Sequence, residues 1–535
     1  MEVSVFGSSQ MGRTDLCYRE LNLCFPNNCN STRILSRKAD RIWFGQGTMW
    51  RKAGLRLALR AVQSEPVRSD RVSLRTSTKP RSLDKVRIFV GLPLDSVSEC
   101  NTVNHARAIA VGLKALKLLG VEGVELPVWW GISEKEAMGK YNWSGYLLIA
   151  DMVQKAGLKL HITLCFHASA QPKISLPEWV SRIGDSQPGI FYADRSGQYY
   201  KDCLSLAVDD LPVLDGKTPI QVYQKFCENF KSSFSSFMGS TITGISMGLG
   251  PEGELRYPST RGQSKRSKLL GAGEFQCYDQ NMLGLLKQHA EANGKSLWGL
   301  GGPHDVPRYD ESPNSNNFFR DNGGSWESPY GDFFLSWYSS LLLSHGDRLL
   351  SLASSTFSDA AVEVCGKVPV LHPWYKTQSH PSELTAGFYN TNNRDGYEAV
   401  AEMFAKNSCK LIVPGMDLSD DHQPQGSLSS PELLLAQIRR ACRNHGVGIS
   451  GQNSSVSGVP GGFEQIKKNL SGENVVDLFT YQRMGAFFFS PEHFPSFTEF
   501  VRSLNQPAWH SDDLPFEEEE LSSASSESEM HMQVA

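Results

Sequence analysis

Residues 86–130 read VRIFVGLPLDSVSECNTVNHARAIAVGLKALKLLGVEGVELPVWW. Two runs rich in β-branched and aromatic residues, Val86–Leu94 and Gly123–Trp130, predict buried strands. Between them, apolar residues recur at helical spacing over Asn104–Leu119, which predicts an amphipathic helix. A strand, a helix and a second strand in this order predict a parallel β–α–β unit.

The same alternation continues to about residue 508. Further strands are predicted at Leu158–His167, Ile242–Gly250, Ser296–Pro303, Val368–Tyr375, Lys410–Met416 and Val447–Asn453. Eight buried strands with helices between them predict an α/β fold, a (β/α)8 TIM barrel. The connections 168–241 and 304–367 are long, and predict long loops on the C-terminal face, where the chemistry of such barrels lies.

The composition narrows the class of protein. The chain has 535 residues, of which 40% are hydrophobic and 21% charged, with a net charge of −4, so wholesale disorder is excluded. There is no overall basic excess, and the basic stretch 261–268 is short and lacks aromatic residues, so no nucleic-acid partner is expected. No apolar run reaches about 18 residues, so no transmembrane helix is predicted and no membrane partner is expected.

The two ends of the chain differ in charge. Residues 1–80 carry 14 Lys and Arg against 6 Asp and Glu, and include no apolar core of a secretory signal. Residues 511–535 carry eight acidic residues and no basic one. We therefore predict an organelle transit peptide and leader over 1–83, the barrel over 84–508, and an acidic, Ser-rich tail over 509–535. The alternatives are a leader without a targeting role and a tail that binds a partner.

The eleven cysteines predict neither a metal site nor a redox motif. Three lie in the leader, the others are scattered, and no C-x-x-C pair occurs. The thiols of the barrel are therefore expected to be reduced and mostly buried. No metal and no cofactor is expected.

The ends of the predicted strands are rich in aromatic and polar residues. They include LPVWWG (126–131), Phe166-His167, GLGPEGELRYPS (248–259) and LHPWYK (371–376). Sugar rings stack on aromatic side chains, and sugar hydroxyls bond to such polar groups, so these residues favour a carbohydrate site. A layer of aromatic core residues is an equally good interpretation.

Longer motifs in the chain resemble those of plant β-amylases, over about residues 86–505. The motifs are GLGPEGELRYPS (248–259), GEFQCYD (273–279), SELTAGFYNTNNRDGY (382–397) and LFTYQRM (478–484). The resemblance implies a hydrolase that inverts the anomeric centre and releases maltose from the non-reducing ends of α-1,4-glucans. It implies no metal and no cofactor for the chemistry.

The resemblance also assigns the two catalytic positions. An inverting glycosidase needs a carboxylic acid that protonates the leaving oxygen and a carboxylate that deprotonates water. The general acid of the family corresponds to Glu254, which is retained. The general base of the family lies in a Gly-Glu-Asn motif, which here reads Gly451-Gln452-Asn453. Because an amide cannot accept a proton near neutral pH, Gln452 predicts an enzyme that is nearly or wholly inactive.

Other positions depart from the family pattern in the same direction. The family has an Asp that binds the terminal glucose where this chain has Pro127, and a substrate-contacting Thr where it has Pro414. A family Trp corresponds to Pro373, and a Leu that inserts into the glucan corresponds to Ser455. After His167, the chain has ASAQPKISLPEW in place of a Gly-rich loop that closes over substrate. The sequence therefore predicts a cleft without its lid.

A further set of side chains matches the family's sugar contacts. These residues are His167, Lys367, His372, Asn453 and Arg483. Retention of these residues by inheritance and barrel packing, without present binding, is the alternative. Asp417 and Asp420 lie near the altered loop and are candidates for a replacement base.

Taken together, the substitutions resemble those of the catalytically inactive plastid members of the family. The strings VGLPLDSVSECNTVNH (90–105), DDLPVLDGKTP (209–219) and SGQNSS (450–455) are of that type. We therefore predict an inactive β-amylase-fold regulator or glucan sensor of starch metabolism in the plastid stroma. Its expected partners are a weakly bound α-1,4-glucan or maltooligosaccharide and an active β-amylase or another protein of starch metabolism. The alternatives are a slow β-amylase and a protein-interaction scaffold that binds no glucan.

Overall fold

The computed structural model describes residues 86–260, 271–454, 461–471 and 476–505, together with the backbone of 42–44 and 48–50. The rest of the predicted leader, the predicted tail, the basic stretch 261–268 and Ser455 lie outside these residues. Within them, no helix combines the length and the apolar character needed to cross a bilayer.

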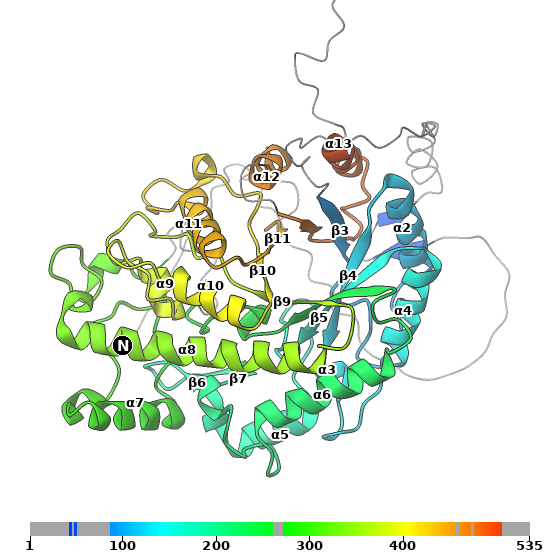
Figure 1. Ribbon diagram of the computed structural model, residues 1–535. Helices are drawn as coiled ribbons and strands as arrows, with labels where there is room; N and C mark the ends of the chain where they lie inside the picture. Colours follow the sequence, from blue (N-terminus) through cyan, green and yellow to red (C-terminus); the bar gives the residue numbers. More distant parts are fainter. Residues whose placement is uncertain are drawn as a thin grey trace, which may run out of the picture.

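Eight parallel strands close into a barrel, which confirms the predicted fold class (Figure 1). Going round the barrel, the order is β3, β4, β5, β8, β9, β10, β11 and β12, and β12 pairs with β3 to close the ring. These strands are β3 (Arg87–Gly91), β4 (Gly123–Trp129), β5 (Lys159–Cys165), β8 (Ile242–Met247), β9 (Glu363–Lys367), β10 (Lys410–Val413), β11 (Ile449–Gln452) and β12 (Leu478–Tyr481).

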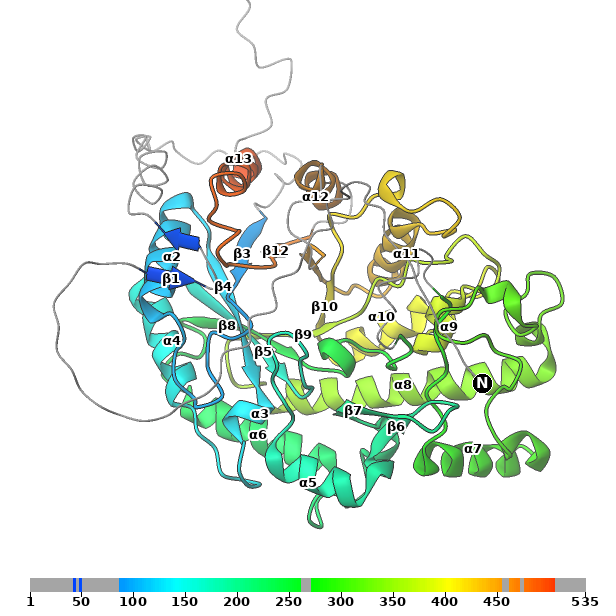
Figure 2. The same ribbon diagram turned by 180° about the vertical axis from the view of Figure 1, so that it is seen from behind.

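Helices surround the strands on the outside of the barrel (Figures 1 and 2). The helices are α2 (Ala106–Leu119), α3 (Trp130–Ser133), α4 (Ser144–Lys155), α5 (Glu178–Ser186), α6 (Pro219–Ser233), α7 (Gln280–Ala292), α8 (Pro329–Thr356), α9 (Pro381–Ala386), α10 (Tyr397–Lys406), α11 (Pro431–Asn444), α12 (Gly462–Leu470) and α13 (Phe494–Asn505). Two small antiparallel pairs complete the fold: β1 (Ile42–Phe44) with β2 (Thr48–Trp50), and β6 (Phe191–Ala193) with β7 (Tyr199–Leu204). The helix predicted over Asn104–Leu119 is α2.

Two predicted strands were wrong, and one strand was missed. The segment Ser296–Pro303 begins with a 3₁₀ turn, where Leu297 and Leu300 are 80% and 81% exposed. Apolar composition alone therefore misled the prediction, because nothing covers these side chains. The segment Val368–Tyr375 is not a strand; the barrel strand is β9, which ends directly before it. The first and last residues of β9 are charged, so the sequence did not indicate a buried strand there. The last strand, β12, is only four residues long and was not predicted.

The first strands and helices form where the sequence favours them. Every residue of β4 is buried, as expected for a parallel strand covered on both faces. Helix α6 starts with a capping box, in which Thr218 and Gln221 satisfy each other's backbone N–H groups. Asp279, the last residue of the GEFQCYD motif, caps α7 by accepting from two backbone N–H groups.

An ion cluster closes the barrel at the amino ends of the strands. Arg87 contacts Glu363 at 3.0 Å and Asp477 at 3.1 Å. Lys410 contacts the same two carboxylates at 2.6 and 2.5 Å. Arg87, Glu363 and Lys410 each begin a strand, and Asp477 directly precedes β12. The predicted site residues belong to the opposite, C-terminal end of the strands.

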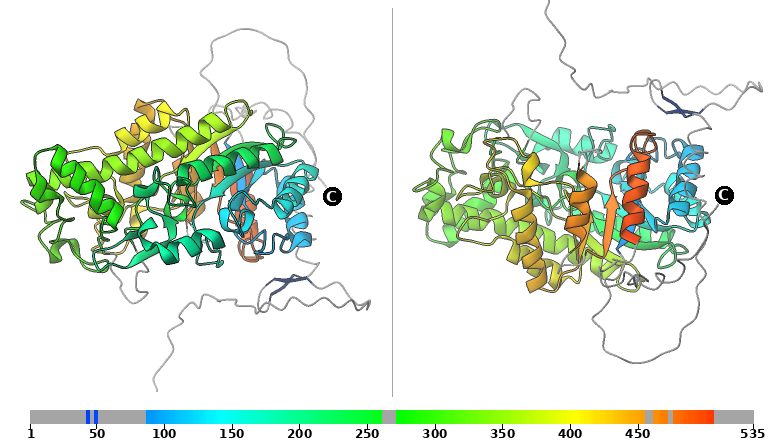
Figure 3. Two further views of the ribbon diagram at one scale, coloured as in Figure 1. Left: turned by 90° about the horizontal axis from the view of Figure 1, so that it is seen from below. Right: turned by 90° about the horizontal axis from the view of Figure 1, so that it is seen from above.

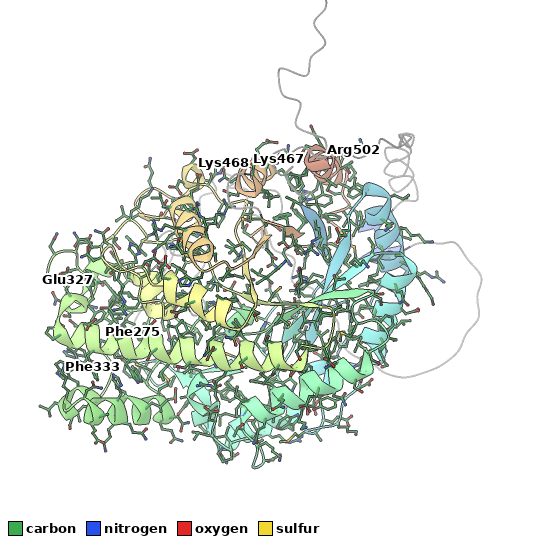
Figure 4. All side chains as sticks on the ribbon, viewed as in Figure 1. Phe275, Glu327, Phe333, Lys467, Lys468 and Arg502 are labelled. Atoms are coloured by element: carbon green, nitrogen blue, oxygen red, sulfur yellow. The ribbon has the colours of Figure 1, made fainter. Side chains whose placement is uncertain are left out.

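The long connection between β8 and β9 builds a lobe beside the barrel. Helix α7 belongs to it, and α8 runs from this lobe back along the barrel, where it contacts β8 and β9 (Figure 3). Phe275 and Phe333 lie in this lobe, whereas Lys467, Lys468 and Arg502 lie on α12 and α13 at the far side of the molecule (Figure 4). The connection is longer than predicted, because Ser296–Pro303 is not a barrel strand.

Candidate active site

The predicted site residues gather at the carboxyl ends of the barrel strands. Lys367 and Gln452 are the last residues of β9 and β11, and Asn453 follows directly. His167 and Arg483 come two residues after β5 and β12, and Glu254 lies in the turn after β8. These residues come from five strands, so only the closed barrel places them around one opening.

Glu254 is held between two cations. Its carboxylate lies 3.2 Å from Lys367 Nζ, and it accepts a hydrogen bond of 2.9 Å from Arg256 Nε. A backbone bridge joins Glu254 to Lys367 as well. Burial favours the neutral acid, but the charges of Lys367 and Arg256 outweigh it and lower the pKa of Glu254. In this state Glu254 is an ionised acceptor, poorly poised to donate a proton.

Gln452 lies on nearly the opposite wall. Going round the ring, β11 is three strands from β8, the strand that precedes the turn holding Glu254. The backbone of Gln452 is fixed, because its C=O accepts from Met416 N at 2.9 Å and its register partner is Thr480. Gln452 is 7% exposed. The backbone at the position assigned to the base is thus fixed, and the amide that it carries cannot act as a general base near neutral pH.

His167 presents one defined tautomer to the site. Its Nδ1 lies 2.9 Å from the carbonyl oxygen of Ala168, and a carbonyl only accepts, so Nδ1 carries the proton. Burial lowers the pKa of His167, which keeps the ring neutral. Its Nε2 faces the Gly253 backbone, next to Glu254. This nitrogen is then an acceptor for a hydroxyl group.

Asn453 and Arg483 are engaged with the protein itself. The Asn453 amide donates to the C=O of Gln482 at 3.0 Å and accepts from its N–H at 2.6 Å. Arg483 Nη1 donates to the C=O of Leu92 at 2.5 Å. These bonds join the ends of β11, β12 and β3. Asn453 therefore supports the wall beside Gln452, and most of its hydrogen-bonding capacity is used there.

The two candidates for a replacement base are both occupied. Asp417 accepts from the N–H and the hydroxyl of Ser454 at 2.5 and 2.6 Å. Asp420 accepts from Ser430 Oγ at 2.6 Å and from Glu432 N at 3.2 Å, at the start of α11. Both carboxylates thus serve local structure, which argues against either as a free base.

His372 lies apart from the other site residues. Its Nδ1 bonds to Ser429 Oγ at 2.6 Å, and burial lowers its pKa to about 4 despite the opposing charge of Asp420. The structure thus joins Glu254 to Lys367, and Asn453 to the Arg483 segment, but places His372 against the loop before α11.

The structure places several positions that depart from the family pattern. Pro127 is buried within β4, opposite Thr163 of β5, and Pro414 directly follows β10. After His167, the chain makes a short hairpin in which Ser169 and Ile174 exchange backbone bonds of 2.8 and 2.9 Å. The buried Ile174 holds this hairpin against the barrel. A fixed turn thus occupies the place of the family's Gly-rich loop.

The aromatic residues at the end of β4 belong mainly to the core. Trp130 is fully buried and packs edge-on against Phe166, Trp179 and Tyr223. Trp129 is 3% exposed, and its indole N–H donates to the C=O of Leu94 at 2.9 Å. For these two rings the core interpretation is therefore correct, and neither offers an open face for a sugar.

One charged residue near the site was missed from sequence. Glu125 lies in the middle of β4, 5% exposed, and accepts from Thr163 Oγ1 at 2.7 Å and from Gln482 Nε2 at 2.5 Å. Burial favours its neutral form, but Arg483 and these hydrogen bonds lower the pKa of Glu125. The available signal was a lone acidic residue in an otherwise apolar strand, GVELPVW. Among the described residues, no group of three His, Cys, Asp or Glu side chains is placed to hold a metal ion.

The sequence profile of Glycosyl hydrolase family 14 matches residues 89–509, which is most of the chain. The chain belongs to this family. It is 60% identical to "Inactive beta-amylase 9" of Arabidopsis thaliana, over 97% of this chain and 96% of the relative. It is 41% identical to "Beta-amylase 1, chloroplastic" of the same plant, over 79% of this chain and 76% of the relative.

A third relative and a solved structure agree with this membership. "Inactive beta-amylase 4, chloroplastic" of Arabidopsis thaliana is 38% identical, over 79% of this chain and 82% of that protein. The catalytic domain of the Paenibacillus polymyxa β-amylase aligns with a TM-score of 0.66 at 24% identity, over 80% of this chain and all of that domain. At this identity, the likeness bears on the fold alone. The family 14 barrel predicted from the motifs is confirmed.

Proposed function

We propose that this family 14 protein is catalytically inactive, binds an α-1,4-glucan or maltooligosaccharide weakly, and regulates or senses glucan turnover in plastids. The observation that carries the proposal is Gln452, which stands at the base position with a fixed backbone and no carboxylate. General-base assistance contributes about 10²–10⁴-fold to such reactions. An inverting mechanism offers no covalent route around its loss.

The retained acid does not compensate for the missing base. Lys367 and Arg256 both contact the Glu254 carboxylate, so it is ionised near neutral pH and lacks the proton that the leaving oxygen needs. The two aspartates near the altered loop are engaged by Ser454 and by the start of α11. A slow β-amylase, the alternative based on the retained Glu254, is therefore the weaker interpretation.

Support for glucan as the ligand comes from the side chains that remain. His167 offers an acceptor nitrogen beside Glu254, and Lys367 offers donors, which together suit sugar hydroxyls. Pro127 and the short hairpin after His167 remove polar partners and enclosure, so the binding is proposed to be weak. The names of two relatives, "Inactive beta-amylase 9" and "Inactive beta-amylase 4, chloroplastic", agree with inactivity, and the second agrees with a plastid location. The proposed protein partner is an active β-amylase or another protein of starch metabolism in the plastid stroma.

Maltose release from soluble starch tests the proposal, with the full chain compared with the Gln452→Glu and Glu254→Gln variants. We expect the wild type to release no more maltose than Glu254→Gln. Release well above that control would refute inactivity and require another group to activate water. Turnover by Gln452→Glu alone would support a cleft that still binds glucan.

Binding is measured separately, by the thermal unfolding temperature of the wild type with and without maltoheptaose. A ligand that binds only the folded state raises this temperature. A rise supports the glucan sensor. No rise at millimolar maltoheptaose would refute glucan binding and favour the scaffold that acts only through protein contacts.

A further inference from the structure

A pair of opposite charges joins β4 to the segment after β12: Glu125 lies in the strand, and Arg483, one of the predicted site residues, has a side chain that is 27% exposed. Glu125 Oε2 is 3.9 Å from Arg483 Nη2, and Glu125 is 5% exposed. Among the carboxylates of the described residues, Glu125 is the one that the structure pairs with this guanidinium. A TIM-barrel interior is usually filled by branched apolar side chains, so a buried carboxylate in a barrel strand requires a reason.

Both partners are fixed by further contacts. Glu125 accepts from Thr163 on β5 and from Gln482 next to β12, whereas Arg483 donates to the C=O of Leu92 after β3. A Cβ at Gly91 would lie 2.9 Å from Gln482 Oε1 and 3.2 Å from Arg483 Nη1, so only a glycine leaves room for them. The pair is thus part of the barrel and not a chance approach of two mobile side chains.

The carboxylate that is paired with Arg483 lies deeper in β4 than Pro127 does. Glu125 and Pro127 are two residues apart in β4, so their side chains face the same way. Pro127 is the one nearer the carboxyl end of the strand, where the cleft opens, and it carries no charge and no hydrogen-bonding side chain. Any ligand that reaches this wall therefore meets a guanidinium that Glu125 has already neutralised.

We propose that Glu125 is a positioning and specificity-determining residue: it neutralises and orients Arg483 from within the barrel, so that this wall accepts a neutral sugar and disfavours an anionic one. The inference rests on the proposed function, because it takes a neutral glucan as the ligand. It adds the residue that sets the charge preference of the cleft.

The test measures the affinity of wild type and of Glu125→Gln for two probes, glucose and glucose 6-phosphate. The second probe differs from the first by its anionic phosphate group. The introduced amide keeps the shape of the carboxylate and can donate to Gln482 Oε1, which has no partner at present. Removal of the charge leaves Arg483 unneutralised. We expect Glu125→Gln to bind glucose 6-phosphate at least about tenfold more tightly than wild type does, with little change for glucose.

Glu363→Gln is the matched control. It changes the net charge by the same amount but at the opposite end of the barrel, where Asp477 still contacts Arg87 and Lys410. It should not gain affinity for glucose 6-phosphate. An equal gain in both variants, or no gain in Glu125→Gln, would overturn the proposal.

A second measurement covers the case in which Glu125→Gln fails to fold. The double variant Glu125→Gln/Arg483→Gln removes both charges and is expected to unfold at a higher temperature than Glu125→Gln alone. A double variant no more stable than the single one would refute the pairing. If wild type binds no maltooligosaccharide while the gain or the coupling is observed, the proposed glucan ligand fails and the role of Glu125 in neutralising Arg483 stands.

Discussion

The variant Glu254→Gln tests whether Glu254 is an ionised carboxylate that is stabilised by its two cationic neighbours. The change keeps the shape of the side chain and removes the charge that Lys367 and Arg256 contact at 3.2 and 2.9 Å. Arg256 keeps a second partner, Glu252, at 2.8 Å, and Lys367 is 26% exposed and can be hydrated. We therefore expect the free energy of unfolding to fall by about the contribution of one hydrogen bond to a charged group, about 1.5–3 kcal/mol.

This free energy converts into a measurable change in the unfolding temperature. For a barrel of roughly 420 residues, an unfolding entropy of about 2.1 cal/mol/K per residue gives about 0.9 kcal/mol/K. A loss of about 2 kcal/mol then lowers the unfolding temperature by about 2 °C. The matched control is Glu252→Gln, which removes a 73% exposed carboxylate from the same Arg256 and should cost less than about 1 kcal/mol.

The pH dependence fixes the sign of the effect. The pKa of Glu254 is lower in the folded protein than in the unfolded chain, where it is about 4.3. Its stabilising contribution is therefore complete above that unfolded value and is lost as the pH falls through the folded pKa. Thermal unfolding followed by near-UV circular dichroism at pH 7 and at pH 3.5 measures this. The difference in unfolding temperature between wild type and Glu254→Gln should be smaller at pH 3.5 than at pH 7. If there is no difference at pH 7, or if the difference grows in acid, Glu254 is protonated in the native protein.

Further predictions concern the core, the ion cluster and one histidine. Trp130→Ala should destabilise by about 3–5 kcal/mol in denaturant titrations, because its indole is fully buried, whereas Leu300→Ser at an 81% exposed position should change stability by less than about 0.5 kcal/mol. Glu363→Gln should lower the free energy of unfolding by about 1–2 kcal/mol. This loss should be smaller at high salt, because the Glu363 carboxylate is 39% exposed and salt screens its ion pairs. The imidazole of His372 should titrate by NMR with a pKa of about 4, and a midpoint near 6.5 would show that the ring is not buried as described.

The sequence alone was sufficient for the class of fold and for the family. Hydrophobic periodicity is a local property, so most strands and α2 could be predicted from it. The long motifs indicated the family, which its profile confirms, whereas the assignment of the two catalytic positions to Glu254 and Gln452 stays a prediction. Prediction failed where burial depends on distant partners: β9 carries charges at both ends that the barrel pairs, and Ser296–Pro303 is apolar but exposed.

Only the tertiary structure decided what the retained residues do. Chain order says nothing of which carboxylates face which cations, because β8, β9 and β12 approach one another only when the barrel closes. That closure places Lys367 against Glu254 and lowers the pKa of this carboxyl, and it brings Glu125 of β4 to Arg483 after β12, 358 positions later in the chain. Electrostatic free energies depend on separation and on burial in three dimensions, so a sequence can name the charges of a site while the fold determines their state.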